Sequence, residues 1–367
     1  MKICFLTNEL SSKDGWSRYS LSLIQQLREK GINCRVLVSS NASKSDLLGV
    51  ECYKVLPPPG PRLGKIFCLA RNFLKIKKLI KECDIIHALI EPYAPIAFFL
   101  KKNRSLIITL HGTYAVIPFK KWYSHKIYSR VYQGADQIIS VSKFTQKEFL
   151  SQVETNNAIV INNGIDYGKF QVEKSFQKKE NSDKIIISVG ALKPRKGYHI
   201  SISAIARVKK KYPRLKYFIV GNQDNNKYYR RLRDLVRQYK LKDNVIFLEN
   251  LSDKKLINLY WQSDLFLLTP VNINGASEGF GLVYLEAGAA NLPSIGTFGC
   301  GAEEAVKNEY SGLLVSQGNI RETEMAILKI LDNPNLARQL GQNGQKYAQE
   351  MDWSRVVGKY IEVYQTL

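Results

Sequence analysis

Long apolar runs are missing from this sequence of 367 residues. A transmembrane helix needs about 18 consecutive apolar residues, and no stretch of the chain approaches that length. The opening MKICFLTNEL reaches a polar turn too early for the apolar core of a secretory signal, and Ile3 to Thr7 within it predicts a buried strand. We therefore expect a globular, cytoplasmic protein.

Paired cysteines and metal-binding motifs are missing as well. The six cysteines are scattered without a C-x-x-C pair, and the four histidines occur without an H-E-x-x-H or D-x-D motif. Reduced thiols in a cytosolic protein explain the cysteines better than disulfides or zinc. We expect no protein-held metal and no cofactor, and the lack of a G-x-x-x-x-G-K-[ST] sequence excludes a Walker A loop.

Acidic residues are few, because 32 Asp and Glu stand against 54 Lys and Arg, which gives a formal net charge of +22. Such an excess favours an anionic partner. Both halves of the chain are basic and no nucleic-acid recognition module is evident, so we expect no nucleic acid as a partner. A basic nucleic-acid-binding protein nevertheless remains the alternative from a different functional class.

Short β-branched runs alternate with amphipathic helical stretches along the chain. This alternation predicts an α/β fold with parallel sheets that are covered by helices on both faces. Twelve candidate strands are too many for one compact sheet, so two sheets of about six are expected. The candidate strands are KICFLT, CRVLVSS, DIIHALI, SLIITLHG, QIISVS, AIVINNG, KIIISVG, KYFIVG, VIFLEN, LFLLTP, LPSIGT and GLLV.

The boundary between the two domains is expected in the polar stretch from Phe170 to Lys184, which has no apolar rhythm. We assign residues 1–172 to a first domain, 173–184 to a linker and 185–345 to a second domain. Only helical patterns follow the last candidate strand, and the final segment is 346–367. Two doubly wound domains place the carboxyl ends of their strands, and hence any ligand, around a cleft.

A cationic loop follows the candidate strand KIIISV directly. Its sequence GALKPRKG begins at Gly190 and carries Lys193, Arg195 and Lys196. The carboxyl end of a strand is where a doubly wound sheet binds its ligand, and three cations there suit an anionic group such as a diphosphate. A solvated basic loop is an equally good interpretation of these residues taken alone.

Two acids flank an almost wholly apolar stretch, EGFGLVYLEAGAA. Glu278 is expected in a loop, and Glu286 about one turn inside a helix that starts near Gly281. The free N–H groups of Phe280, Gly281 and Leu282 can hold phosphate or sugar oxygens, and the two carboxylates can accept hydrogen bonds from hydroxyls. This pattern fits a sugar nucleotide. The alternative makes Glu278 a partner of the helix N-terminus and Glu286 half of an internal ion pair.

Several of these segments together resemble the retaining, nucleotide-sugar-dependent glycosyltransferases of family 4, also called group 1. EGFGLVYLEA resembles their E-x7-E signature, and ISVGALKPRKG resembles their G-R-L-x-x-x-K-G loop. SVSKFT, VINNGID and the final DWSRVVGKYIEVY are similar to further family segments. The resemblance covers nearly the whole chain and implies the GT-B fold, in which two Rossmann-like domains face a cleft and a terminal helix crosses back to the first domain.

The resemblance also implies roles for the charged residues of the second domain. Glu286 would bind the ribose hydroxyls and Glu278 the hydroxyls of the donor sugar. Arg195 and Lys196 would neutralise the leaving diphosphate, with Lys193 and the backbone at Gly190 beside them.

Further positions follow from the same resemblance. The backbone at Asn250 and Leu251 would meet the base, and His111, in TLHG, would face the donor sugar as a catalytic residue. The acceptor-side loop is usually a Gly-Gly pair, but here it reads KDGWSRYS and contributes Gly15 and Trp16.

The implied reaction moves a sugar from a nucleotide-diphosphate sugar to a glycan or lipid-linked acceptor, with retention of configuration and without a metal. Cations and helix-end amides would stabilise the charge on the leaving oxygens directly. Surface polysaccharide or glycolipid synthesis is the expected pathway. A non-catalytic relative that only binds nucleotide sugars is an alternative.

A basic amphipathic helix is predicted over Pro61 to Lys81, which carries seven Lys and Arg and no acid. This helix would either lie on an anionic membrane surface or pack its apolar stripe on the first sheet, and the second interpretation is slightly favoured. Phe119 to Tyr132 adds aromatic and basic residues of the kind that suit a membrane interface. Peripheral attachment to the inner face of the membrane is therefore an open alternative to a freely cytoplasmic enzyme.

Overall fold

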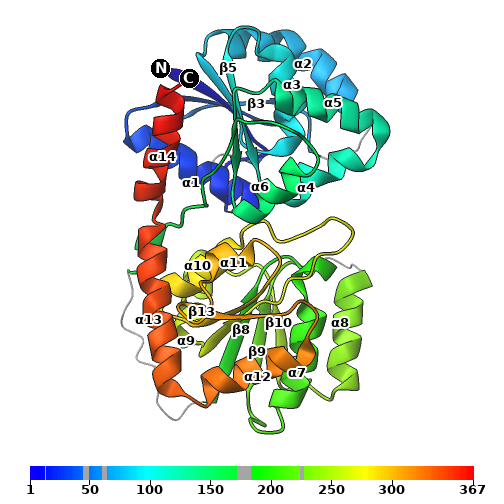
Figure 1. Ribbon diagram of the computed structural model, residues 1–367, viewed down its shortest axis with the longest axis vertical. Coiled ribbons are helices and arrows are strands. Elements are labelled where there is room, and N and C mark those ends of the chain that lie inside the picture. Colours follow the sequence, from blue (N-terminus) through cyan, green and yellow to red (C-terminus); the bar gives the residue numbers. More distant parts are fainter. Residues whose placement is uncertain (13, 44–48, 60–63, 172–182, 224–226) are drawn as a thin grey trace. The chain divides into compact units, whose positions relative to one another are not determined.

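The computed structural model describes residues 1–12, 14–43, 49–59, 64–171, 183–223 and 227–367, with the side chains of 64–66 left out. The chain forms two compact units (Figure 1). Unit 1 contains Met1–Gly164 and Trp353–Leu367, and unit 2 contains Ile165–Asp352. These divisions lie near residues 172 and 345, where the sequence suggested boundaries. Most of the expected linker, 173–184, lies outside the described residues.

Unit 1 is built on a parallel sheet with the strand order β3-β2-β1-β4-β5-β6-β7 in the described residues. The first candidate strands of the sequence are present, but the prediction missed β3. The sequence of this strand shows no clear alternation of polar and apolar residues. Glu51 and Lys54 are exposed at the sheet edge, and only Val55 and Leu56 are buried. The strands are β1 (Lys2–Leu6), β2 (Asn33–Ser39), β3 (Glu51–Leu56), β4 (Ile85–Ala88), β5 (Ser105–Leu110), β6 (Gln137–Ser140) and β7 (Ala158–Val160).

Helices connect and cover these strands. Asp14 caps the first of them, because its Oδ1 accepts hydrogen bonds from the N–H groups of Trp16 and Ser17 at 2.9 and 3.0 Å. The helices of unit 1 are α1 (Gly15–Glu29), α2 (Gly64–Lys81), η1 (Glu91–Tyr93), α3 (Ala94–Leu100), α4 (Thr113–Val116), η2 (Ile117–Lys120), α5 (Trp122–Gln133), α6 (Lys143–Leu150) and α14 (Trp353–Gln365).

The last helix, α14, packs against α1 through buried polar groups as well as apolar ones (Figure 1). The Tyr360 hydroxyl lies 2.9 Å from that of Tyr19, and the Tyr364 hydroxyl lies 2.8 Å from Nδ1 of His87. His87 Nε2 lies 2.8 Å from Oγ1 of Thr109, so the network continues into the sheet. Burial lowers the pKa of His87 to about 3, and this imidazole is therefore neutral.

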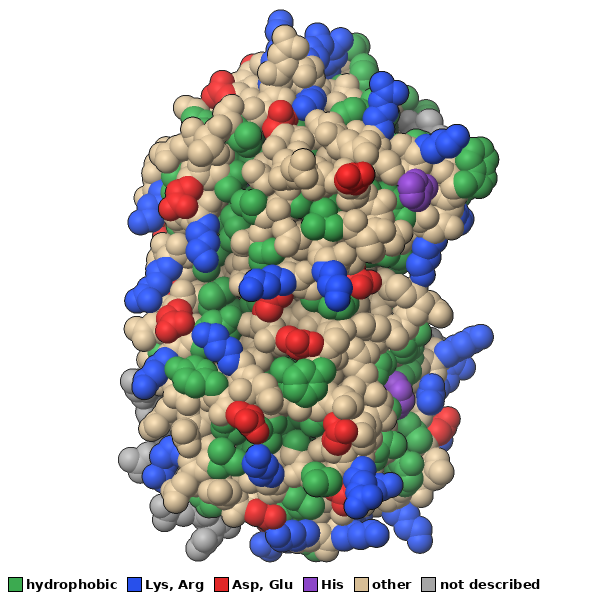
Figure 2. Space-filling model, viewed as in Figure 1, with side chains coloured by type: hydrophobic (Ala, Val, Ile, Leu, Met, Phe, Trp, Pro, Cys, Tyr) green, Lys and Arg blue, Asp and Glu red, His purple; other side chains and the backbone are tan. Residues whose placement is uncertain are grey.

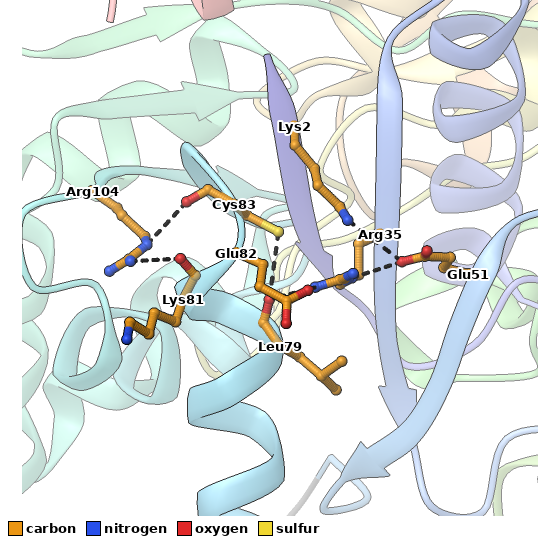
Figure 3. Close-up of polar contacts among 8 residues, drawn as sticks. All are labelled: Lys2, Arg35, Glu51, Leu79, Lys81, Glu82, Cys83 and Arg104. Atoms are coloured by element: carbon orange, nitrogen blue, oxygen red, sulfur yellow. Dashed lines mark hydrogen bonds and ion pairs between the residues drawn. The ribbon is translucent and has the colours of Figure 1, made fainter.

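An ion-pair cluster ties the β3 edge to the rest of unit 1 (Figure 3). The buried Arg35 on β2 contacts Glu51 at 2.8 Å and Glu82 at 2.7 Å, and thereby joins β3 to the residue that follows α2. Arg104 donates to the carbonyl oxygens of Cys83 at 2.9 Å and Lys81 at 2.8 Å. This cluster lies at the amino end of β4, so its role is structural.

Unit 2 is built on a second parallel sheet with the order β10-β9-β8-β11-β12-β13 in the described residues. The strands are β8 (Ile185–Val189), β9 (Lys216–Val220), β10 (Val245–Leu248), β11 (Leu265–Leu267), β12 (Ser294–Thr297) and β13 (Gly312–Val315). The helices are η3 (Tyr167–Phe170), η4 (Pro194–Lys196), α7 (Tyr198–Val208), α8 (Lys227–Gln238), α9 (Asp253–Gln262), α10 (Leu282–Ala289), α11 (Ala302–Ala305), α12 (Ile320–Leu331) and α13 (Pro334–Glu350). The expectation of two parallel-sheet Rossmann-like domains is confirmed.

The predicted basic helix is α2, although Pro61 and the two residues after it lie outside the described part. Ile76 and Ile80 are buried against the sheet, as the packing interpretation required. Phe67, Phe73 and Leu74 are nevertheless exposed on the same helix. Lys and Arg side chains are scattered over both units on the face drawn in Figure 2. Among the described helices, none combines the length and apolar character that crossing a membrane requires.

The six cysteines are all free thiols. Four of them, Cys4, Cys34, Cys83 and Cys300, are buried, and Cys52 and Cys68 are partly buried.

Candidate functional site

The cationic loop of unit 2 turns back sharply after β8. Gly197 follows η4 with φ +72°, and a Cβ at this position would lie 1.6 Å from the carbonyl oxygen of Thr269, so only glycine fits. This close approach brings η4 against the segment that follows β11. Lys193 at the start of η4 is exposed, whereas Lys196 is buried.

Arg195 and Lys196 form a compact ion-pair cluster with Glu278. Lys196 Nζ and Arg195 Nη1 lie 2.7 and 2.8 Å from the same oxygen, Oε2 of Glu278. Burial alone would raise the pKa of Glu278, but the charges of Lys196 and Arg195 outweigh burial and lower this pKa to about 2. Burial lowers the pKa of Lys196, and Glu278 opposes that shift. Glu278 is therefore a carboxylate at neutral pH, held between two cations.

This cluster bears on the solvated-loop interpretation of the cationic residues, while a diphosphate as their ligand stays a prediction. Lys196 is buried and Arg195 is partly buried, whereas Lys193 is exposed, as the solvated alternative described. Glu278 lies in the loop before α10, as expected, and its side chain pairs with two cations of η4. The ion pairs of Glu278 with Lys196 and Arg195 are therefore a feature of this site.

Arg195 also fixes the loop that carries Glu278. Its carbonyl oxygen accepts the N–H of Val271 at 2.8 Å, and its Nη1 donates to the carbonyl oxygen of Ser277 at 3.1 Å. Both ends of the loop 271–277 are thereby attached to one residue. Arg195 thus holds the backbone of the loop in place and also contributes a positive charge to the site.

The N-terminus of α10 lies next to Glu278. Gly281 is the N-cap with φ +89°, Leu282 is the first helical residue and Phe280 is buried. The first N–H groups of a helix have no partner within that helix, and the positive end of the helix dipole lies there. This helix N-terminus is where phosphate or sugar oxygens are expected, and that expectation stays a prediction.

Glu286 lies inside α10, as the sequence predicted, and its side chain is buried. The hydroxyl of Tyr260 on α9 donates a hydrogen bond of 2.9 Å to its Oε2. The Tyr260 ring packs near Phe170 and Phe266, with centroid distances of 6.2 and 6.0 Å. Tyr260 was missed because only the fold brings α9 to α10. The one signal in the sequence was that an acid in an apolar helix needs a donor.

The residues expected to meet a base lie just after β10. Asn250 is exposed and has φ 55°, and Leu251 is partly buried. The ends of neighbouring strands approach closely here, since a Cβ on Gly221 would lie 2.1 Å from the carbonyl oxygen of Gly190. Asn250 and Gly190 therefore lie at the same edge of the unit 2 sheet as η4 and α10.

In unit 1, His111 follows β5 at the carboxyl edge of the sheet. Its ring Nε2 lies 2.8 Å from the carbonyl oxygen of Leu89, and the Tyr19 ring packs against it in a T-shaped arrangement with a centroid distance of 4.7 Å. Trp16 lies 6.5 Å from the same ring, so the structure brings His111 and Trp16 together. Gly15 is the exposed first residue of α1. Burial lowers the pKa of His111 to about 4.

Glu91, at the start of η1, is a residue that the sequence analysis missed. Its carboxyl is buried and its Oε1 accepts the N–H of His111 at 2.6 Å. Burial raises its pKa to about 7, although this backbone N–H opposes the shift. The only signal in the sequence was an acid directly after the strand run DIIHALI.

The described residues contain no group of three or more His, Cys, Asp or Glu side chains that could hold a metal ion. The expectation of a metal-independent site stays a prediction.

Two Rossmann-like units, each built on a parallel sheet, are the architecture of the GT-B class of fold. Sequence families described as "Glycosyl transferases group 1" and "Glycosyltransferase Family 4" match residues 170–347 and 13–169. An uncharacterized glycosyltransferase of Methanocaldococcus jannaschii is 30% identical over 350 residues, covering 93% of this chain and 92% of the relative. The chain therefore belongs to the group 1, family 4 glycosyltransferases, which confirms the resemblance found in the sequence.

The names of two further similar proteins mention their ligands. The GDP-mannose-dependent alpha-(1-6)-phosphatidylinositol monomannoside mannosyltransferase of Mycobacterium tuberculosis is 24% identical over 310 residues, covering 79% of this chain and 78% of the relative. HepE of Anabaena, solved in complex with UDP and glucose, superposes with a TM-score of 0.80 at 22% identity over the full length of both chains. The second similarity establishes the fold alone.

Proposed function

We propose that this glycosyltransferase moves a sugar from a nucleotide-diphosphate sugar to a glycan or lipid-linked acceptor, with retention of configuration and without a metal. The observation that carries the proposal is the cluster of Arg195, Lys196 and Glu278 beside the N-terminus of α10. Cations next to a hydroxyl-accepting carboxylate suit a ligand that is both a diphosphate and a sugar.

The charges of the cluster suit the departure of a diphosphate. Cleavage of the bond between the sugar and the diphosphate places negative charge on the leaving oxygen, and preorganised cations and helix-end amides stabilise that charge. Lys196 and Arg195 supply the cations, with N–H groups at Phe280 and Leu282 close by in the chain. Glu278 stays ionised at neutral pH and can accept hydrogen bonds from sugar hydroxyls. Retention, with the leaving phosphate taking the acceptor proton, follows from the family resemblance.

The nucleoside is proposed to bind with its ribose at Glu286 and its base at the backbone of Asn250 and Leu251. Tyr260 holds one carboxylate oxygen of Glu286, which limits the rotation of the carboxylate. HepE binds UDP, which supports a nucleoside diphosphate as the ligand of this chain.

The acceptor is proposed to bind at unit 1, near Gly15 and Trp16. The mycobacterial relative is named for a phosphatidylinositol mannoside acceptor, which supports a lipid-linked glycan and glycolipid or surface polysaccharide synthesis for this chain.

Thermal stabilisation by UDP, GDP and ADP in excess EDTA tests the proposal. A ligand at about 100 times its dissociation constant adds about 2.7 kcal/mol to the free energy of unfolding. We expect one diphosphate to raise the melting temperature of the wild type, and Glu286→Ala to abolish the effect. The control is Glu350→Ala, an exposed carboxylate on α13. If no diphosphate stabilises the protein, or if the effect needs a metal, the proposal is wrong.

We also propose that unit 1 binds anionic membranes peripherally. Leu74 is 77% exposed and Phe67 74% exposed on the basic helix α2, and Trp122 is 75% exposed on α5. Exposed apolar side chains among lysines suit a lipid surface, where the apolar groups insert and the lysines meet phosphate groups. The protein should co-sediment with vesicles that contain phosphatidylglycerol and not with neutral vesicles, and Leu74→Ser should weaken binding. Equal binding to both kinds of vesicle would contradict this proposal.

A further inference from the structure

A buried carboxyl group lies beside the loop that carries His111. Glu91 is 1% exposed and stands where β4 gives way to η1. Its Oε1 accepts the N–H of His111 at 2.6 Å, whereas its Oε2 has no hydrogen-bond partner among the described residues. Buried carboxyl groups are costly, and one with an unpartnered oxygen calls for a functional explanation.

The segment that carries Glu91 makes a second contact with His111, this time with its imidazole ring. The ring Nε2 lies 2.8 Å from the carbonyl oxygen of Leu89, two residues before Glu91. A carbonyl oxygen can only accept a hydrogen bond, so Nε2 carries the proton. Because burial keeps the imidazole neutral at physiological pH, its Nδ1 carries a lone pair. His111 therefore presents a hydrogen-bond acceptor rather than a cation.

We propose that Glu91 is a positioning residue, which together with the Leu89 carbonyl fixes His111 in the Nε2–H tautomer so that Nδ1 accepts a hydrogen bond from a hydroxyl of the bound sugar. The sugar contact rests on the proposed function. The tautomer and its dependence on Glu91 rest on the contacts within unit 1 alone.

Because Oε2 has no partner in the described part of the chain, the Glu91 carboxyl can gain or lose a proton there while Oε1 still holds the backbone of His111. A proton on Oε2 leaves the lone pairs of Oε1 free for the N–H of His111, so the contact persists in both protonation states. The titratable side chains near Glu91 are His111, Tyr19 on α1, and Tyr128 and Tyr132 on α5, and all are neutral at pH 7. A glutamine at residue 91 offers the same carbonyl-type acceptor and should preserve the geometry, whereas an alanine removes it.

Long-range 1H–15N correlation spectra of the histidine rings provide the test, because the chain has only four histidines to assign. We expect His111 to be the Nε2–H tautomer in the wild type and to stay neutral down to about pH 5. Glu91→Gln should keep this signature, and Glu91→Ala should give a mixture of tautomers. The control is Glu82→Ala at the opposite end of β4, which should leave the His111 signals unchanged.

Sugar transfer from the nucleotide sugar that the wild type uses provides the second readout. Glu91→Ala should lower kcat by at least tenfold with a KM for the donor within about threefold of the wild type, and Glu91→Gln should restore most of kcat. A wild-type His111 that is the Nδ1–H tautomer or protonated at pH 7 overturns the proposal, as does an alanine variant with wild-type spectra and kcat. The wild-type spectrum gives this answer even if the alanine variant does not fold. If the wild type transfers no sugar but shows the Nε2–H tautomer, the proposed function fails while the positioning by Glu91 stands.

Discussion

The buried carboxyl of Glu91 should make the stability of unit 1 depend on pH in a way that one substitution can isolate. Its pKa is about 7 in the folded protein, against 4.5 for an ordinary glutamate. The folded state therefore holds a proton that the unfolded state releases between about pH 4.5 and pH 7. By linkage, this group destabilises the folded state above pH 7, and the penalty is relieved as the pH falls through that window.

The size of the effect follows from the shift. A difference of about 2.5 pKa units corresponds to about 3 kcal/mol in the free energy of unfolding, of which about 2.5 kcal/mol is relieved between pH 8 and pH 5. Glu91→Gln removes the titration. The stability of the wild type relative to this variant should therefore rise by about 2.5 kcal/mol as the pH falls from 8 to 5.

Two histidines titrate with the opposite sign in the same range. Burial lowers the pKa of His87 to about 3 and that of His111 to about 4, so the unfolded state binds protons below about pH 6.5 that the folded state refuses. They leave the stability unchanged at pH 8, where both are neutral in the folded and unfolded states, and they destabilise the folded state as the pH falls below about 6.5. Because both histidines remain in the Glu91→Gln protein, their contribution cancels in the difference between the two proteins.

Thermal unfolding at pH 5, 6, 7 and 8 measures this difference. For a unit of this size, about 2.5 kcal/mol corresponds to roughly 5 to 10 °C in melting temperature. Tryptophan fluorescence can follow the transition, since Trp16, Trp122 and Trp353 belong to unit 1. A melting-temperature difference that stays constant from pH 5 to pH 8 would refute the reasoning.

Two further predictions concern unit 2. Gly197→Ala should destabilise unit 2 by more than about 2 kcal/mol in chemical unfolding, because its Cβ would lie 1.6 Å from the Thr269 carbonyl oxygen, whereas Gly318→Ala, with φ +76° and open space around it, should cost only about 1 kcal/mol. Tyr260→Phe removes a hydrogen bond to the carboxylate of Glu286 and should weaken binding of the diphosphate that stabilises the wild type by about tenfold in calorimetric titration.

Each of these two predictions has a specific contrary result. Equal losses of stability at Gly197 and Gly318 would mean that backbone conformation, and not the contact with Thr269, decides the effect. For the second prediction, Tyr284→Phe is the matched control, because the Tyr284 hydroxyl bonds the carbonyl oxygen of Leu268 at 2.8 Å. Equal loss of affinity in both tyrosine variants would argue that packing, and not the bond to the acid, supports binding.

The charged loops of unit 2 could be predicted from sequence because a parallel sheet collects the carboxyl ends of its strands at one edge. Arg195 and Lys196 follow β8, and Glu278 belongs to the connection between β11 and α10, so the topology alone brings them near one another. Glycines marked the loop boundaries, and the apolar run after Gly281 marked the helix that contains Glu286. The position of each residue along its element was therefore readable.

The partners of these residues could not be read from sequence in the same way. Tyr260 of α9 meets Glu286 of α10 only because the fold brings the two side chains together, and Glu91 meets His111 across 20 residues of chain. The two residues of each pair are far apart in the sequence, so no local sequence pattern indicates the contact between them. The prediction missed β3 for a related reason, since an edge strand buries too few side chains to show a clear period.

Glu278 in unit 2 and Glu91 in unit 1 are buried carboxyl groups whose pKa values shift in opposite directions, and this difference suits the division of chemistry that we propose. In unit 2, two cations keep Glu278 ionised, with a pKa of about 2, and the cluster carries a net positive charge that favours a diphosphate. In unit 1, Glu91 lies among neutral side chains and its pKa rises to about 7, while His111 stays neutral. A leaving group that gains charge needs the first environment, because fixed cations stabilise it most in the transition state. An uncharged sugar needs the neutral environment of unit 1. There the proposed orientation of Nδ1 of His111 selects a hydroxyl, and no cation is present in the pair of Glu91 and His111 to attract the diphosphate.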